Sequence, residues 1–173
     1  MDLKQMLDVD NSLGILIKLT GKSFEKAVDI ELKEKCGLTA GQGKIIIALA
    51  LQEGQSQKEI SNAMFLDGST LVPIIDKMEN NGFVVRKPNP KDRRNHKIYL
   101  TQKSKALIDL VARCVLDIRR VATQNISETQ LNITKKVLKQ LTANTEQHIE
   151  KKSNQIKVTS KSQRISRRRQ NAK

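Results

Sequence analysis

The sequence predicts a mainly α-helical (α+β) fold in which a two-stranded sheet follows a pair of short helices. A helix opens at Ser56, which has Glu59 three residues later, and residues 70–81 repeat apolar side chains at helical spacing. Residues 83–85 and 97–100 have strand composition and flank a basic loop, 87–96. This order predicts a winged helix-turn-helix domain, which inserts one helix into a DNA major groove and grips the duplex beside it with the two-stranded wing.

Long amphipathic helices are predicted on both sides of this domain. Apolar side chains recur at helical spacing over residues 11–34, and Thr39 with Gln42 forms a second capping box that opens the next helix. After the hairpin, Thr101 is placed to cap a helix over 102–124, and Ser127 with Gln130 opens another that ends near residue 150. The apolar faces of the outer helices exceed what a small winged domain covers. They therefore predict a homodimer, with an intramolecular bundle in a monomer as the alternative.

These patterns divide the chain into four segments. Residues 1–36 are predicted to form an N-terminal dimerisation helix, 37–101 the winged helix-turn-helix DNA-binding domain, and 102–150 the C-terminal dimerisation helices. Residues 151–173 contain too few apolar side chains to bury, so we predict a disordered basic tail there, with a continued terminal helix as the alternative.

The charge of the chain indicates a polyanionic partner. The formal net charge is +14, and residues 151–173 hold nine of the 32 Lys and Arg residues and none of the acids, which leaves +5 for residues 1–150. Double-stranded DNA is the first partner this predicts; an anionic membrane surface and a solvated tail without a partner are the alternatives. Aromatic residues make up only 2% of the chain, which argues against single-strand or RNA binding by base stacking.

Other function classes find little support in the sequence. The two cysteines, Cys36 and Cys114, lie far apart and form neither a disulfide framework nor a zinc motif, so we expect a reducing cytoplasmic, nucleoid-associated location. No secretory signal is present, and the longest apolar run, 45–51, is too short to span a bilayer, so no membrane partner is expected. Catalytic and nucleotide-binding motifs are absent from the sequence, and His96 has no second ligand at metal-binding spacing, so we predict no enzyme, no cofactor and no metal.

Four motifs in register resemble the MarR (multiple-antibiotic-resistance regulator) family of transcription factors. They are L-T-x-x-Q from Leu38, S-x-x-E-I from Ser56, N-N-G-F-V-V-R from Asn80, and D-R-R-x-x-K-I-Y-L-T from Asp92, which resembles the wing signature of the family. The resemblance covers about residues 10–148. It implies a dimeric winged-helix regulator in which a ligand or oxidant changes the spacing of the two DNA-binding domains.

The predicted DNA contacts lie at the start of the first short helix, on the recognition helix and along the wing. They are Ser56, Gln57, Ser69, Thr70, Val72, Lys77, Arg86, Lys91, Arg93, Arg94, His96 and Lys97. The resemblance implies that Arg94 enters the minor groove and that Asp92 braces it. We expect Arg86 to contact phosphate or to pair with Asp92, and Asp76 to turn aside or to brace a basic neighbour. A solvated basic hairpin is the alternative for the wing.

The segment STLVPIIDKMENNG most resembles the organic-hydroperoxide-sensor branch of the family. Pro73 fits that branch and is expected within or just after the first helical turn, whereas Val72 replaces a threonine that would donate a hydrogen bond. Residues 1–35 lack the cysteine and tyrosines of these sensors. Cys36 is the candidate redox site if nearby lysines lower its pKa, with an inert thiol as the alternative. Phe24 is the candidate lining residue for a small anionic or aromatic effector.

Together these observations predict a sequence-specific, double-stranded DNA-binding transcriptional regulator. The expected form is a homodimeric repressor on a pseudo-palindromic operator, and release by a small ligand is an added hypothesis. Two alternatives remain open: a non-specific architectural DNA-binding protein, for which the basic tail argues, and a thiol-based redox regulator acting through Cys36.

Overall fold

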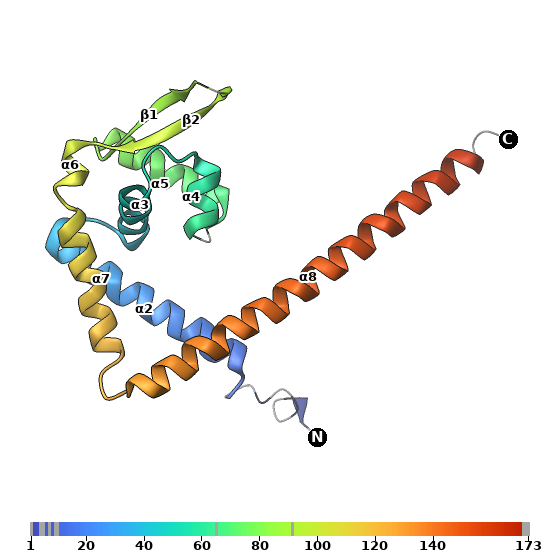
Figure 1. Cartoon of the computed structure of the whole chain (residues 1–173), viewed down its shortest axis with the longest axis horizontal. Coiled ribbons are helices and arrows are strands. Elements are labelled where there is room, and N and C mark those ends of the chain that lie inside the picture. The colour runs from blue at the N-terminus through green and yellow to red at the C-terminus, as the bar shows by residue number, and fades with distance from the viewer. Residues whose placement is uncertain are drawn as a thin grey trace. The chain divides into compact units, whose positions relative to one another are not determined.

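The structure, a computed structural model, describes residues 2–3, 6, 8, 11–64, 66–90 and 92–170, with the side chains of 92–94 and 157–170 outside the description. The chain divides into two compact units, Met1–Ala122 and Thr123–Lys173. The first unit holds the elements labelled in Figure 1: α2 (Leu13–Cys36), α3 (Ala40–Leu51), α4 (Gln57–Met64), α5 (Gly68–Asn80), β1 (Val84–Asn89), β2 (Asp92–Leu100), α6 (Gln102–Lys105) and α7 (Ile108–Ala122). The predicted mainly α-helical fold with a two-stranded antiparallel wing is confirmed.

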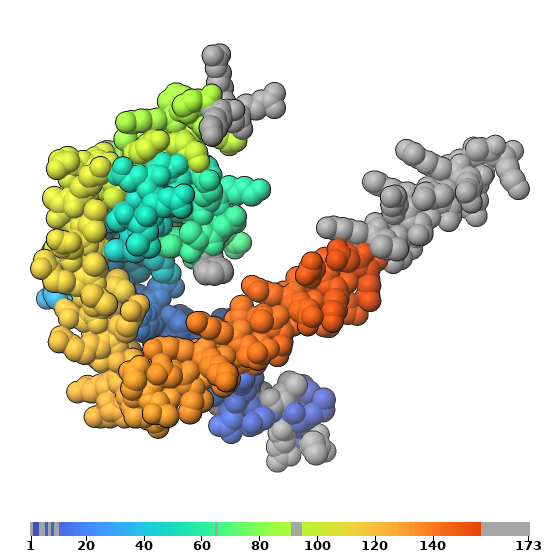
Figure 2. Space-filling model, viewed as in Figure 1, coloured from blue at the N-terminus to red at the C-terminus, as the bar shows by residue number. Residues whose placement is uncertain are grey.

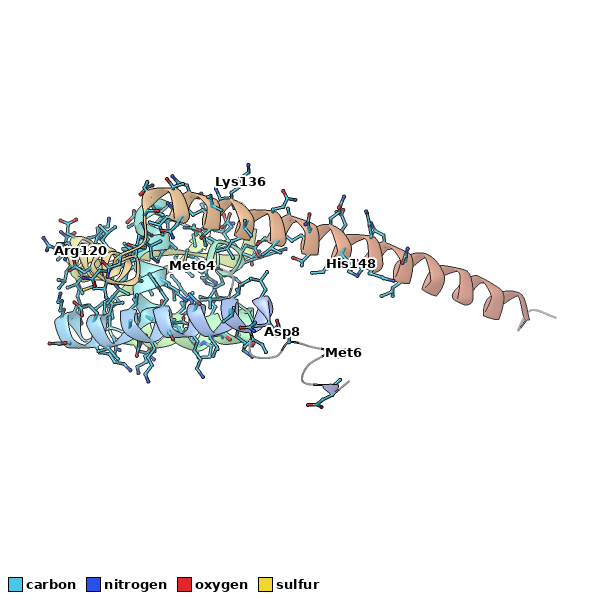
Figure 3. The ribbon with its side chains drawn as sticks, turned by 90° about the horizontal axis from the view of Figure 1, so that it is seen from below. Met6, Asp8, Met64, Arg120, Lys136 and His148 are labelled. Atoms are coloured by element: carbon cyan, nitrogen blue, oxygen red, sulfur yellow. The ribbon has the colours of Figure 1, made fainter. Side chains whose placement is uncertain are left out.

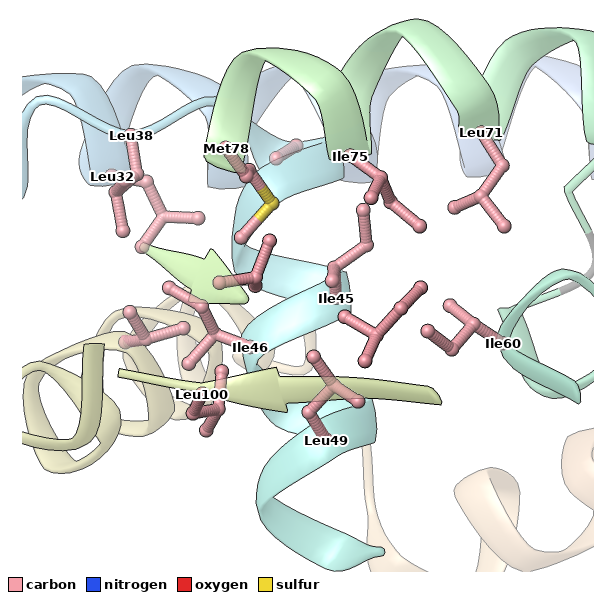
Figure 4. Close-up of a cluster of buried hydrophobic side chains, with 14 of the residues drawn as sticks. Leu32, Leu38, Ile45, Ile46, Leu49, Ile60, Leu71, Ile75, Met78 and Leu100 are labelled. Atoms are coloured by element: carbon pink, nitrogen blue, oxygen red, sulfur yellow. The ribbon is translucent and has the colours of Figure 1, made fainter. Parts of the chain in front are cut away.

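Helix α3 is the centre of the core in this unit. Its side chains Ile45, Ile46 and Leu49 are fully buried. They meet buried residues from the neighbouring elements (Figure 4), among them Leu32, Leu38, Ile60, Leu71, Ile75, Met78 and Leu100. Burial of one such aliphatic side chain contributes about 1.5–3 kcal/mol. Since α4, α5 and the sheet all pack on α3, this core fixes the position of the helix-turn-helix and of the wing base.

Gly43 allows α2 and α3 to approach closely. The sequence alone gives no reason for a glycine in the first turn of α3, where it lowers helix propensity. A Cβ built at Gly43 would lie 2.5 Å from Leu32 Cδ1 and 3.5 Å from Val111 Cγ1. Leu32 and Val111 are both fully buried. Gly43 is therefore a packing residue at the point where α2, α3 and α7 meet.

Three predicted capping boxes form as expected. The Ser56 amide donates to Glu59 Oε2 at 2.6 Å and the Glu59 amide to Ser56 Oγ at 3.3 Å. Thr39 and Gln42 form the same reciprocal pair at the start of α3, and Ser127 and Gln130 form the third.

Thr101 occupies the predicted N-cap position, but the helix it starts is the short α6, and its side chain makes no capping hydrogen bond. Its hydroxyl donates to the Gly82 carbonyl at 2.7 Å, so it joins the end of the wing to the turn after α5. The predicted helix over 102–124 is divided into α6 and α7 by a turn at residues 106–107. The Thr101 side chain makes a tertiary contact, which the spacing of nearby residues in the sequence does not predict.

The wing strands are longer than predicted, because most of the expected loop over 87–96 is strand. The two strands pair from Val84 opposite Leu100 to Pro88 opposite His96, and the register shifts after Pro88. In a two-stranded sheet both strands are edges, so a proline without an N–H is tolerated there.

The second unit is built on one helix, α8 (Glu128–Gln170), which spans 43 residues. The tail predicted to be disordered therefore continues this helix to Gln170, which was the alternative. The physical reason is that residues 128–170 contain no Gly or Pro to end a helix and are rich in Lys, Arg and Gln. Side chains of residues 128–156 are mostly exposed (Figure 2), and Lys136 and His148 project from the helix (Figure 3). Among the described residues, no helix is long and apolar enough to cross a membrane.

Candidate nucleic-acid interface

Helix α5 has one face in the core and the opposite face in solvent. Leu71, Ile75 and Met78 are fully buried against the first-unit core. The predicted recognition residues lie on the other side, where all are exposed: Ser69, Thr70, Val72 and Lys77. Val72 is 40% exposed. An exposed helix face held on a packed scaffold is the arrangement required for entry into a major groove.

The start of α5 differs from the prediction. The helix begins at Gly68, so Ser69 lies inside it and Asp67 occupies the N-cap position without a side-chain hydrogen bond. Pro73 is the sixth residue of the helix, which places it just after the first turn, within the predicted range. Because proline has no N–H, the Ser69 carbonyl lacks its partner four residues on. The recognition helix thus carries a polar group available to solvent or a ligand at its exposed N-terminal end.

A hollow of about 400 Å³ lies between the starts of α4 and α5 and the wing. It brings together five of the predicted DNA contacts: Ser56, Gln57, Val72, Arg86 and His96. Lys58, Ser61, Gly68, Leu71 and Asn95 complete its lining. Hydroxyl, amide, guanidinium and imidazole groups thus converge beside the exposed face of α5, and all of them can donate to a phosphate.

Arg86 on β1 is bound by two carboxylates of the recognition helix. Its Nη2 lies 2.5 Å from Asp76 Oδ1, its Nη1 donates to Glu79 Oε2, and its amide donates to Glu79 Oε1 at 3.0 Å. Asp76 thus braces a basic neighbour, which was one of its two predicted roles. The predicted contact of Arg86 with phosphate stays a prediction, and so does its pairing with Asp92, whose side chain lies outside the described residues. Two acids three residues apart on a DNA-facing helix are the sequence signal that an internal cation would hold them, and sequence reasoning missed Glu79.

The charge balance of this cluster favours the ionised forms of Arg86 and Glu79. Partial burial of the guanidinium opposes its charge, but the hydrogen bonds it donates to Asp76 and Glu79 raise the pKa of Arg86. Burial likewise disfavours the charged Glu79 carboxylate, yet the Arg86 amide and guanidinium lower its pKa. The Arg86 side chain is only 20% exposed, and both of its terminal nitrogens bind carboxylates of α5.

Lys97 on β2 is also paired internally. Its Nζ lies 2.8 Å from Glu59 Oε2 on α4. The Lys97 ammonium, followed by the Ser56 amide and hydroxyl, lowers the pKa of Glu59 to about 2. Lys97 lies opposite Lys87 in the sheet, and Lys87 Nζ lies 5.0 Å from the centre of the Tyr99 ring. Repulsion between these facing lysines is thereby reduced, since one has a carboxylate and the other an aromatic face.

The remaining predicted wing contacts are placed as follows. His96 is exposed beside the hollow. Lys91 and the side chains of Asp92, Arg93 and Arg94 lie outside the described residues, so the roles predicted for them, including the bracing of Arg94 by Asp92, stay predictions.

Phe24 lines a shallow groove between α2 and α7. The groove has a volume of about 450 Å³, and its other lining residues are Leu19, Thr20, Ser23, Ala27, Ile118, Val121 and Ala122. Its surface is mostly apolar, and Thr20 and Ser23 supply the polar side chains. It suits an apolar or aromatic group better than a compact anion.

The surroundings of the Cys36 thiol favour the inert alternative over the redox hypothesis. Burial raises its pKa, against a smaller lowering by the Leu38 amide, and its Sγ donates to the Leu32 carbonyl at 3.1 Å. Lys33 and Lys35, the expected activating cations, are instead paired with Asp29 and Glu31. Cys114 is fully buried, and burial raises its pKa as well. Within the described part of the chain, no group of His, Cys, Asp and Glu side chains forms a metal site.

Comparison with known proteins identifies the same segment. The MarR family profile matches residues 38–96. The HTH-type transcriptional regulator SarZ of Staphylococcus haemolyticus is 34% identical over 94 residues, which cover 54% of this chain and 63% of that regulator. This chain thus spans slightly less than two thirds of that relative. SarZ of Staphylococcus aureus is 30% identical over 122 residues, covering 70% of this chain and 80% of the relative.

The fold also matches solved structures. A mutant MarR from E. coli in complex with operator DNA superposes with a TM-score of 0.72 and 22% identity, covering 82% of this chain and 99% of that one. The relatives are named as transcriptional regulators, which agrees with the prediction of a regulator rather than an enzyme.

Proposed function

The chain belongs to the MarR family of DNA-binding transcriptional regulators, and we propose that it acts as a homodimeric repressor on a pseudo-palindromic operator. The observation that carries this proposal is the exposed N-terminal face of α5 beside the polar hollow. Ser69, Thr70, Val72 and Lys77 would enter the major groove, where Val72 suits a thymine methyl and the hydroxyls suit base edges or phosphate. The free amides at the start of α5 favour a phosphate at the same end.

The wing would grip the duplex beside the recognition helix. Lys91, Arg93 and His96 are assigned to phosphate, and Arg94 to a narrow minor groove, whose negative potential attracts a guanidinium. Ser56 and Gln57 at the start of α4 would bind phosphate from the other side of the hollow. Arg86 is assigned a positioning role, because Asp76 and Glu79 hold it. The Lys97 ammonium would interact with both Glu59 and the duplex.

Exposed apolar residues at the start of α2 support a second copy as partner. Leu16, Ile17 and Leu19 are between 43% and 56% exposed. In the second unit, Ile133, Val137 and Leu138 on α8 are between 40% and 59% exposed. Apolar area of this kind is commonly buried by a two-fold copy. A two-fold dimer would place its recognition helices about 34–36 Å apart, one turn of B-DNA.

Control by an effector is the finer part of the proposal. The groove at Phe24 is assigned to a small aromatic molecule, with Thr20 and Ser23 as donors to an anionic substituent. Titration of salicylate-like anions against operator binding should weaken affinity, and Phe24→Ala should abolish the response. An unchanged affinity over the titration would remove the effector from the proposal. DNA binding also assigns the protein to the nucleoid in the cytoplasm.

Selection of bound sequences from a random DNA pool tests the main proposal. The expected product is an inverted repeat with half-sites about 10 bp apart. Affinity for the selected sequence and for its scrambled form is then compared at about 0.15 M salt, where specific complexes are typically at least a thousandfold tighter. Equal affinities would instead support a non-specific architectural DNA-binding protein.

A further inference from the structure

The C-terminal half of α8 has an ordered distribution of charge. The helix continues to Gln170, and the last acidic residue of the chain is Glu150. Four basic residues beyond it follow the spacing i, i+4, i+7, i+11: Lys157, Lys161, Arg164 and Arg168. At 3.6 residues per turn these positions fall on one side of the helix. We define them as the basic stripe.

The basic stripe lacks internal counter-charges along its own helix. Ion pairs on a helix join residues three or four apart, and no Asp or Glu occurs within six residues of any stripe position. By contrast, Arg86 and Lys97 of the wing are each bound by carboxylates. The two wing cations thus have carboxylate partners, whereas the four aligned cations of the stripe have no acidic residue at helix-pairing distance. This difference indicates that the stripe binds an external polyanion.

The opposite side of the same helix is polar and uncharged over most of its length. Its positions are Gln155, Thr159, Ser162, Ser166 and Gln170. A helix that lies on a membrane needs a broad apolar face opposite its basic face, which these residues do not supply. Residues 123–173 also contain no Phe, Tyr or Trp, so stacking on single-stranded bases is not available. Of the common polyanions, the phosphates of a duplex fit best.

From this pattern we infer that the basic stripe is a second, sequence-independent DNA-binding surface, separate from the winged helix-turn-helix. The stripe extends over twelve residues, roughly 16 Å from the first position to the last, a length over which B-DNA carries on the order of ten phosphate charges. Lys and Arg on one helix face would follow the phosphates of a duplex, and the uncharged face would stay in solvent. The inference rests on the proposed function only in sharing its ligand, DNA.

A pair of charge-matched variants of the full chain tests this. The stripe variant is K157Q/K161Q/R164Q/R168Q, and the control is K151Q/K152Q/R167Q/R169Q, which removes the same charge from positions off the stripe. Gln keeps helix propensity close to that of Lys and Arg, and circular dichroism checks that both variants keep the same helix content. Binding to a scrambled duplex is measured between 0.05 and 0.2 M salt.

The stripe variant should bind the scrambled duplex more weakly than the control. Each lost phosphate contact lowers affinity roughly fivefold at about 0.15 M salt and reduces the slope of log affinity against log salt by about 0.9. Equal losses in the two variants, or a loss in neither, would overturn the inference. So would a loss confined to anionic vesicles or to duplex RNA, measured in parallel.

The same data keep the two proposals apart. The winged helix-turn-helix determines the ratio of the affinity for the operator to the affinity for the scrambled duplex. This ratio should therefore stay constant in both variants. If the chain shows no operator preference but the stripe variant selectively loses affinity for the scrambled duplex, the proposed regulator function is refuted and DNA binding by the basic stripe is supported. If the chain prefers the operator but the stripe variant shows no selective loss, the regulator function is supported and DNA binding by the basic stripe is refuted.

Discussion

The guanidinium of Arg86 on β1 is bound by the carboxylate of Glu79 on α5, with Asp76 as a second partner. This contact joins the wing directly to the recognition helix. A basic residue at the edge of the proposed DNA-binding surface therefore has an internal structural role, and its removal would leave two carboxylates unpaired on that surface.

Replacing Arg86 by Ala should reduce both stability and DNA affinity. The loss leaves Glu79 without its guanidinium, and we expect about 1–2 kcal/mol of destabilisation, since the site is partly solvated. Urea unfolding measures the stability and a binding titration the affinity. Lys77→Ala is the matched control, because Lys77 is exposed on the same helix: it should weaken binding while stability changes by less than about 0.5 kcal/mol. A stable Arg86→Ala variant with weakened binding would instead identify Arg86 as a direct phosphate contact.

Replacing Arg94 by Ala should weaken DNA binding more than replacing Val72 by Ala. In the proposed complex, Arg94 would bring a full charge to the minor groove, whereas Val72 would offer one apolar contact to a thymine methyl. Binding titrations of both variants on the selected operator provide the comparison. The reverse ranking would place sequence recognition on α5 rather than on the wing.

The pair of Glu59 and Lys97 predicts a pH dependence of stability. Because the pKa of Glu59 in the folded state is about 2, against an ordinary 4.5, its contribution is complete above about pH 4.5. That contribution is lost as the pH falls toward 2. The carboxylate is half exposed, so we expect no more than about 1 kcal/mol.

The matched variant for this test is Glu59→Gln, which keeps the capping box and removes only the charge. The stability difference between the two proteins, from urea unfolding, should shrink between pH 5 and pH 3. A difference that does not change over this range would show that the ion pair contributes nothing.

Gly43→Ala should destabilise the first unit although alanine is the better helix former. The added methyl would overlap Leu32 in a fully packed core, and overpacking of this kind costs about 1–3 kcal/mol. Gly21→Ala is the control, since nothing lies within 4 Å of a Cβ there, and it should stabilise α2 by up to about 1 kcal/mol. Thermal unfolding measures both, and a neutral Gly43→Ala would refute the close approach of α2 and α3.

Cys36→Ser should leave the response of DNA binding to peroxide unchanged. Burial raises the pKa of the Cys36 thiol, so little thiolate is present at neutral pH and oxidation is slow. The measurement is operator affinity before and after peroxide treatment in both proteins. A response present in the parent and missing in Cys36→Ser would restore the redox hypothesis.

Local patterns predicted the starts of α3, α4 and α8 well. The capping boxes at Thr39, Ser56 and Ser127 each depend on two residues three positions apart, and all three form. The buried face of α5 likewise follows from apolar spacing. These features are decided within one or two helical turns, so the sequence contains all the information they need.

Features decided by contacts between distant residues were missed. The Thr101 side chain, at the N-cap position of α6, binds the Gly82 carbonyl and makes no capping hydrogen bond. Arg86 binds Glu79, a partner that the sequence did not predict. The glycine at position 43 is explained only by Leu32, which comes from another helix. In each case the partner lies seven or more residues away, where spacing rules give no signal.

Each strand of the wing is fastened to a different helix of the helix-turn-helix, β1 to α5 through Arg86 and β2 to α4 through Lys97. The base of the wing is therefore ordered before any duplex arrives. Binding of the protein to DNA then requires no folding step at the base of the wing. The association rate should therefore depend on diffusion and on the attraction of opposite charges. We expect added salt to slow operator capture steeply, while the shape of the complex is already present in the free protein.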